Sequence, residues 1–182
     1  NLRKALRPIA PAKTGSYAAA TAGLLVDYGA RLGRKLACIR SIADQDKIHG
    51  ARIAGKRLRY ILEPLAAELS GAKRTVESLK TFQDRFGLLC DDFARARALR
   101  QAAETLGADR ARAALERASG APAEVPDSLE SLLPGLAALA RRVEREAARR
   151  HAAIERRYLG DAGTFLKPVS ILAHRLGVVA QL

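Results

Sequence analysis

Apolar residues recur at helical spacing along almost the whole chain, and the alternating pattern of a β-strand is close to absent. Val and Ile are few, and they never alternate with polar residues over a strand-length run. Helical segments separated by short breaks are typical of an antiparallel helical bundle. The pattern predicts five to seven helices over the ranges 1–13, 16–42, 47–69, 73–106, 109–118, 127–158 and 165–182.

Two of these ranges have a well-defined apolar face. In 16–42 the expected core side consists of Leu24, Leu25, Tyr28, Leu32, Leu36 and Ile39. In 73–106 the apolar stripe spans roughly 80° of the helix, and it consists of Leu79, Phe82, Phe86, Leu89 and Phe93. Gly87 interrupts this helix without a proline, which predicts a tolerated glycine or a close contact with another helix. The clearest linker is 120–126, because it is made of turn formers and small residues.

Composition adds a strong charge to this all-helical picture. The chain has 32 Lys+Arg against 19 Asp+Glu, a formal net charge of +13, and aromatic residues make up only 4%. A surplus of this size raises self-repulsion, which favours an anionic partner. Nucleic acid, an acidic membrane surface and polyphosphate all qualify. The alternative is a solvated, Arg-rich surface that reflects compositional bias alone.

The charge is concentrated on one face of the helix expected at 47–69. In a helical projection, Leu58, Ile61, Leu62, Leu65 and Leu69 share a face with Ala51 and form the expected core side. Another face carries a contiguous polar stripe, about 20 Å long. We call this stripe the basic ridge; it consists of His49, Arg52, Lys56, Arg59, Tyr60 and Glu63.

The ridge is poorly compensated by acidic residues. Segment 47–63 holds five Lys+Arg and one Glu, and like charges three or four residues apart cost a few tenths of a kcal/mol per pair. An anionic ligand would remove that cost, and Arg can chelate two phosphate oxygens where Lys acts as a point charge. Gly50 and Gly55 would let a helix or a ligand approach closely. The alternative is an ordinary basic amphipathic helix.

Further cations occur on other helices. In 127–158, one face carries Arg141, Arg145, Arg149 and Arg156, opposite Leu136, Val143, Ala147 and Ile154. Two interpretations stay open for this face: a second ligand wall, or a solvated face partly neutralised by Glu144, Glu146 and Glu155. In 73–106, Lys80, Gln83, Gly87 and Asp91 share one face. Asp91 is expected to orient a cation of the ridge or to make a surface pair.

Two ordered motifs resemble the CHAD family, the conserved-histidine α-helical domain. The first is His49-Gly-Ala-Arg52-Ile-Ala-Gly-Lys56-Arg-Leu-Arg59-Tyr60, and the second is Leu79-Lys80-Thr-Phe-Gln83-Asp84-Arg-Phe-Gly87-Leu-Leu-Cys-Asp91. Together they cover about a quarter of the chain, and the remainder agrees only in being helical and basic. No His-x-x-Arg helix precedes residue 47, so the resemblance is to the second repeat of the family.

The resemblance implies a CHAD-like architecture of two bundles about a pseudo-twofold axis, with a basic central channel that binds inorganic polyphosphate. Residues 1–43 would then be the end of the first repeat, and 44–182 the second. The resemblance places His49, Arg52, Lys56 and Arg59 in the channel, with Lys80 close by. The full set of expected polyphosphate contacts adds Arg57, Arg141, Arg145 and Arg149, with Tyr60, Gln83 and Asp91 as orienting residues.

Other functions find less support in the residues. The three histidines are His49, His151 and His174, and no His-Glu-x-x-His, nucleophile-elbow or phosphate-loop motif is present. His151 is expected to pack in the core. The chain is therefore expected to be neither an enzyme nor dependent on a metal or cofactor. Non-sequence-specific nucleic-acid binding, or general polyanion binding, is the main alternative, although four Tyr and four Phe supply few stacking platforms. A scaffold that binds partners through its helix faces is a third.

The remaining features concern location and extent. No signal peptide and no apolar run of membrane-spanning length is present, so the expected location is the cytoplasm, without membrane insertion and with polyphosphate granules as the place of association. Cys38 and Cys90 are expected to be packing residues. The chain begins at Asn1 and has no Met, which predicts a fragment of a longer protein. The oligomeric state is left open.

Overall fold

The computed structural model describes residues 14–120 and 128–179, and every regular element within these ranges is helical. The order of elements is α1 (Thr14–Ala37), α2 (Gln45–Leu62), the 3-10 helix η2 (Glu63–Leu65), α3 (Ala72–Ala118), α4 (Ser128–Ile154), the π-helical η3 (Glu155–Leu159) and α5 (Ala162–Val179). The all-α prediction is confirmed. The helix expected at 1–13 and most of the linker expected at 120–126 lie outside the described residues.

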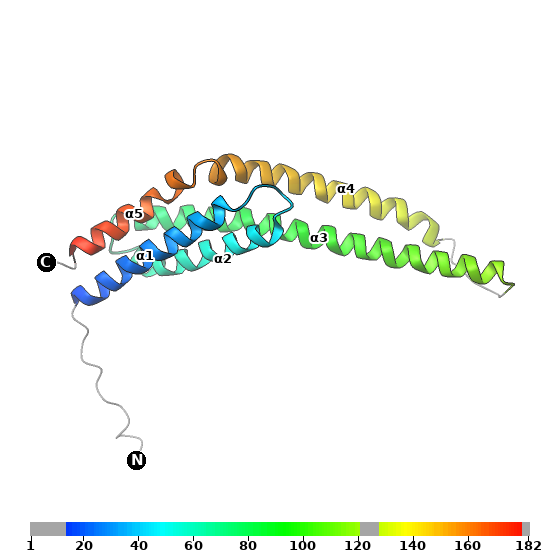
Figure 1. Cartoon of the computed structure of the whole chain (residues 1–182), viewed down its shortest axis with the longest axis horizontal. Helices are drawn as coiled ribbons and strands as arrows, with labels where there is room; N and C mark the ends of the chain where they lie inside the picture. Colours follow the sequence, from blue (N-terminus) through cyan, green and yellow to red (C-terminus); the bar gives the residue numbers. More distant parts are fainter. Residues whose placement is uncertain (1–13, 121–127, 180–182) are drawn as a thin grey trace, which may run out of the picture.

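The helices form a bundle with a long extension (Figure 1). Helix α1 packs between α2 and α5, and α2 packs against α3. The far half of α3 and the first half of α4 continue beyond this bundle as an antiparallel pair, which makes the molecule elongated and gently curved (Figure 1). The prediction of packed helices is confirmed. The pseudo-twofold arrangement of two bundles stays a prediction.

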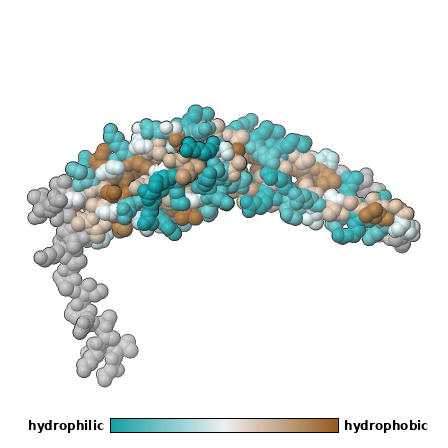
Figure 2. Space-filling model, viewed as in Figure 1, coloured by the Kyte–Doolittle hydropathy of each residue, from teal (hydrophilic) through white to brown (hydrophobic). Residues whose placement is uncertain are grey.

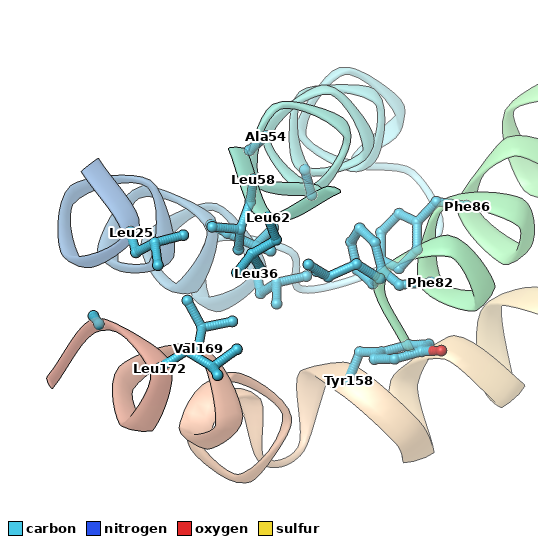
Figure 3. Packing of buried hydrophobic residues seen from close by; sticks show 14 of the residues in the cluster. Leu25, Leu36, Ala54, Leu58, Leu62, Phe82, Phe86, Tyr158, Val169 and Leu172 are labelled. Carbon is cyan, nitrogen blue, oxygen red and sulfur yellow. The ribbon is translucent and has the colours of Figure 1, made fainter. Parts of the chain in front are cut away.

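The core runs through the centre of the bundle. Leucines from α1 and α2 meet Phe82 and Phe86 of α3, with Tyr158 below them and Val169 of α5 opposite (Figure 3). The ring of Phe82 lies 5.1 Å from that of Tyr158 and 5.3 Å from that of Phe165, centroid to centroid. The predicted α3 stripe is therefore the core face of this helix, with only Phe93 at its margin. His151 is buried, as expected.

Several predicted positions are wrong. Leu24 is 46% exposed although Leu25 beside it is fully buried. Cys38 is exposed because it follows the end of α1. The helix expected at 16–42 ends at Ala37, since the carboxylate of Asp44 accepts hydrogen bonds from the backbone N–H of Arg40 at 2.7 Å and of Ser41 at 3.2 Å. These bonds hold the chain in a turn that leads into α2.

Other helix boundaries also differ from the expected ranges. Helix α2 ends at Leu62 rather than at 69, because Pro64 has no N–H to donate and forces the change into η2. The two helices expected at 73–106 and 109–118 are one continuous α3. A Cβ at Gly107 would meet nothing within 4 Å, so no close contact requires a glycine at this position. Helix α5 begins at Ala162, where the Asp161 carboxylate accepts the Thr164 N–H at 2.9 Å.

The division of the chain into two repeats at residue 43 stays a prediction. The described residues before and after this position share one hydrophobic core. Leu25, Leu32 and Leu36 of α1 belong to the same buried cluster as Leu58 of α2 and Phe82 of α3. Whatever repeat α1 derives from, it completes the bundle that supports α2.

Hydrophilic and apolar residues are mixed on the face seen in Figure 2, with the densest polar cover over the middle of the molecule and apolar spots both over the bundle and along the extension. Across 14–120 and 128–179, none of the helices combines the length and the hydrophobicity that crossing a membrane requires.

Candidate anion-binding site

The outward face of α2 carries the basic ridge. The positions that α2 buries against its neighbours are Ile48, Ala51, Ala54, Gly55, Leu58 and Leu62. The remaining positions are partly or fully exposed. Of the ridge residues, His49, Lys56, Tyr60 and Glu63 are exposed, whereas Arg52 and Arg59 are half-buried.

The side chain of Arg52 lies over α3 at Gly87. A Cβ at Gly87 would lie 3.4 Å from Nε of Arg52 and 3.8 Å from its Nη2. Any larger residue at this position would force the guanidinium to shift. The close contact that the sequence suggested at Gly87 is therefore with an arginine of the ridge rather than with another backbone.

Three polar atoms in this region are buried without a hydrogen-bond partner within the described part of the chain. They are Nε of Arg52, Nε of Arg59 and Oε1 of Gln83. Nε of Arg59 lies 3.5 Å from Oε1 of Glu63, close enough for an ion pair but without hydrogen-bond geometry. Buried donors without an acceptor are costly, by about 1–3 kcal/mol each, and a ligand with several acceptor oxygens would satisfy the two arginines. The Gln83 amide can rotate to present its NH2 in place of its oxygen.

Tyr60 lies beside two of the ridge cations, Lys56 and Arg59. Its ring centroid lies 4.9 Å from Cζ of Arg59 and 5.5 Å from Nζ of Lys56. The ring is 48% exposed, and cations at this distance from an aromatic face are attracted to it. The tyrosine thus restricts the positions of both cations without neutralising them.

The remaining candidate residues near the ridge are His49 of α2 and Lys80 and Asp91 of α3. Lys80 is exposed, and His49 shares a small cavity with Cys90 and Arg97. Burial raises the pKa of the Cys90 thiol, against an opposing effect of the Arg52 charge. In the structure as described, no hydrogen bond or ion pair joins the Asp91 carboxylate to the ridge; its backbone oxygen accepts from Nε of Arg95 at 3.2 Å.

The arginines of α4 are not brought together with the ridge. Arg141, Arg145 and Arg149 are exposed on a helix that packs on α3, and the described parts of α4 and α2 do not touch (Figure 1). Arg145 and Arg149 line a separate cavity between α3 and α4. Arg149 lies 3.6 Å from Glu146, while Glu144 pairs with Arg100 of α3 at 3.2 Å rather than with a neighbour on its own helix. Arg57 also lies apart, on the side of α2 that faces α1.

The structure contains two groups of charged residues that the sequence did not predict. Arg31, Arg34 and Lys35 of α1 face α2 beside Arg57, and only their spacing of three and four residues could have signalled a common face. Asp92, which is 2% exposed, binds Nη1 of Arg150 at 2.7 Å and Nη2 of Arg95 at 2.9 Å. Its partner on α4 is distant in sequence, so no local pattern indicates the pair.

The family model described as CHAD domain matches residues 1–100 of the chain, which is more than half of its length. The matched part includes α1, α2 and the first part of α3. It therefore contains the whole basic ridge on α2 and the part of α3 that Arg52 contacts. No curated protein and no solved structure matches the chain.

Proposed function

Because the chain belongs to the CHAD domain family, which is associated with polyphosphate binding, we propose that it binds inorganic polyphosphate through the basic ridge. The observation that carries the proposal is the pair of buried Nε donors on Arg52 and Arg59, neither of which has a hydrogen-bond acceptor among the described residues. A chain of phosphates would supply acceptor oxygens and negative charge at both positions.

The spacing of the ridge supports an extended ligand. Arg52, Lys56 and Arg59 occupy about two helical turns, which corresponds to roughly 10 Å along the axis. Only Glu63 opposes them within the ridge, at 3.5 Å from Arg59. Successive phosphates along a linear polymer can therefore meet successive cations, with Arg57 outside this row and Lys80 at the α3 margin.

The test is a charge reversal of the ridge with a charge-matched control. The triple variant Arg52→Glu, Lys56→Glu, Arg59→Glu is expected to lose retention on immobilised polyphosphate while keeping its helical circular dichroism and its Tm within a few degrees. The control reverses Arg112, Arg117 and Lys167, which are exposed on the far half of α3 and on α5. Both variants change the net charge equally, so equal loss of binding would refute the ridge as the site.

A third variant decides the role of α4. Reversal of Arg141, Arg145 and Arg149 to Glu tests whether these arginines form a second wall for the ligand. We propose that they contact it only weakly, because the described part of α4 does not touch α2. Loss of binding equal to that of the ridge variant would instead assign α4 to the site.

General polyanion or nucleic-acid binding is the competing function, because phosphate contacts alone require only Lys and Arg. A competition assay with duplex DNA distinguishes the two functions. Duplex DNA at equal phosphate concentration is expected to displace polyphosphate poorly, since a ridge on one helix fits a thin, flexible strand of phosphates better than a wide duplex. Ready displacement would favour the general function.

We propose further that the binding is non-catalytic. Support comes from His49, which is exposed and has no hydrogen-bonded carboxylate among the described residues to act as an orienting partner. Incubation of the protein with long-chain polyphosphate, with and without Mg²⁺, should leave both the chain length and the free phosphate concentration unchanged. Time-dependent shortening that the ridge variant abolishes would contradict this.

A further inference from the structure

Helices α1 and α2 lie side by side (Figure 1). A second cationic groove lies between them, on another face of α2 than the ridge. It encloses about 600 Å³, and its lining contains five basic side chains and no acidic one. The basic residues are Arg31, Arg34, Lys35, Lys47 and Arg57. The first four belong to none of the motifs discussed above, and Arg57 points away from the basic ridge.

The two helices run antiparallel along this groove. Nζ of Lys35 lies 3.2 Å from the place that a Cβ on Gly50 would take, so the Lys35 side chain extends from α1 and rests on the backbone of α2 at Gly50. Tyr28 and Arg57 lie at one end of the groove, and Cys38 and Lys47 lie at the other, next to the turn that connects the helices. The ends are about 15 Å apart.

The cations of the groove are mostly uncompensated. In the described ranges, no carboxylate lies within ion-pair distance of Arg31, Arg34, Lys35 or Arg57, and only Lys47 has such a partner, Asp44 at 2.7 Å. Several unpaired cations held within one groove repel each other. They would bind a compact anion with several charges.

The floor of the groove differs from that of the ridge because it is apolar. Tyr28, Ile53 and Ala54 line it, and the ring of Tyr28 lies 5.2 Å from the guanidinium carbon of Arg31. An inorganic phosphate chain would gain nothing from this surface. A ligand that joins a planar apolar group to phosphates would bury it, with the planar group against Tyr28 and Arg31 and the phosphates toward Lys35 and Lys47.

From these features we infer that the α1–α2 groove is a binding site for a nucleoside triphosphate, separate from the ridge. The volume falls within the usual range of small-ligand sites, about 300–1,000 Å³. The inference does not rest on polyphosphate binding by the ridge, because it uses other residues on another face of α2.

The experiment compares ATP, inorganic tripolyphosphate and adenosine by isothermal titration calorimetry in EDTA. It uses the full chain with Arg52→Glu and Lys56→Glu, so that the ridge does not bind the tripolyphosphate. ATP is expected to bind at least about tenfold more tightly than tripolyphosphate, although the latter carries at least as much charge, and adenosine alone is expected to bind weakly. Equal affinity for ATP and tripolyphosphate would overturn the proposal, because the apolar floor would then contribute nothing.

Variants locate the site. Arg34→Glu with Lys35→Glu should abolish ATP binding, whereas Arg52→Glu with Lys56→Glu on the ridge should leave it within about twofold. Tyr28→Ala should reduce the affinity for ATP to that for tripolyphosphate, and Tyr28→Phe, which keeps the ring, should retain it. Loss of ATP binding in the ridge variant with retention in the groove variant would move the nucleotide to the ridge and refute the assignment. Thermal unfolding of each variant verifies that it is folded.

Discussion

At the scale of single residues, glycines mark the places where another side chain rests on α2 or α3. A Cβ at Gly55 would lie 2.8 Å from Cδ1 of Phe82, a fully buried ring in the aromatic cluster. Gly55→Ala is therefore expected to lower the free energy of unfolding by about 1–3 kcal/mol, because the ring must move within a packed core.

The control for Gly55→Ala is Gly107→Ala, since a Cβ there would meet nothing within 4 Å. This change should be neutral or should stabilise the protein by up to about 1 kcal/mol through helix propensity. Urea denaturation of both variants measures the difference. If Gly55→Ala were as stable as Gly107→Ala, the close packing of α2 on Phe82 would be wrong.

Gly87 tests the geometry of the ridge without removing a charge. A Cβ at this position would lie 3.4 Å from Nε of Arg52, so Gly87→Ala should displace the guanidinium by a few tenths of an ångström and Gly87→Leu by much more. Polyphosphate affinity is expected to fall slightly in the first variant and about tenfold in the second. Binding isotherms and urea denaturation together separate this effect from a loss of stability; equal affinities in all three proteins would contradict it.

Asp44 gives the connection between α1 and α2 a dependence on pH. A hydrogen bond from the Lys47 side chain, followed by that from the Arg40 backbone N–H, lowers the pKa of Asp44 from 3.8 to about 2. A carboxyl with a lowered pKa stabilises the fold fully above its unfolded-state pKa, and this contribution is lost as the pH falls through the folded-state value.

Asp44→Asn is therefore expected to be less stable than the parent protein at pH 7, and the difference should shrink as the pH falls from about 4 to about 2. Urea unfolding at a series of pH values measures it. A difference that stayed constant down to pH 2 would show that the charge of Asp44 does not hold the turn.

At the scale of elements, periodicity identified the helices but not all of their ends. The core stripe of α3 was predictable because Phe82, Phe86 and Leu89 recur at helical spacing and all are buried. The end of α2 was missed because leucines continue to Leu69 while Pro64 changes the backbone to η2. The burial of Leu24 was wrongly predicted because it is adjacent in sequence to the buried Leu25, about 100° away around the helix. Only the positions of the neighbouring helices decide which of the two leucines is covered.

A buried ion pair, which we call the Asp92 clamp, joins α4 to α3. Asp92 is almost fully buried and binds Arg150 of α4 at 2.7 Å, and Arg150 also donates to the backbone oxygen of Leu88 at 3.3 Å. Asp92→Ala removes the buried anion and leaves the partly buried Arg150 with Glu146, at 3.2 Å, as its remaining anionic partner. The expected loss of stability is about 2–3 kcal/mol.

Asp109→Ala provides the matched control for this clamp, because its pair with Arg112 joins two exposed side chains at 3.4 Å on the same helix. Such a pair contributes about 1 kcal/mol at most. Thermal unfolding of the two variants is the measurement. Similar Tm values would mean that the clamp does not stabilise the packing of α4 on α3.

At the scale of the whole molecule, the sequence predicted the ridge but not its relation to the other cations. The one-sided placement of Arg52, Lys56 and Arg59 on α2 follows from residue spacing alone. That α4 does not touch α2, and that Arg57 faces α1 instead, follows from the order in which the helices pack. Spacing within one helix contains no information on that order, so cations that look equivalent in the sequence lie on three different surfaces.

The separation of these surfaces predicts how binding responds to salt. Polyphosphate binding should weaken linearly on a plot of the logarithm of affinity against the logarithm of salt concentration, because each phosphate contact releases counterions. Neutralisation of one contacting cation, as in Lys56→Ala, should reduce the slope by about one. Arg117→Ala removes a charge that is also exposed, on the far half of α3, and it should leave the slope unchanged. If both variants reduced the slope equally, the protein would bind through its net charge of +13 as a whole, and the ridge would have no special role.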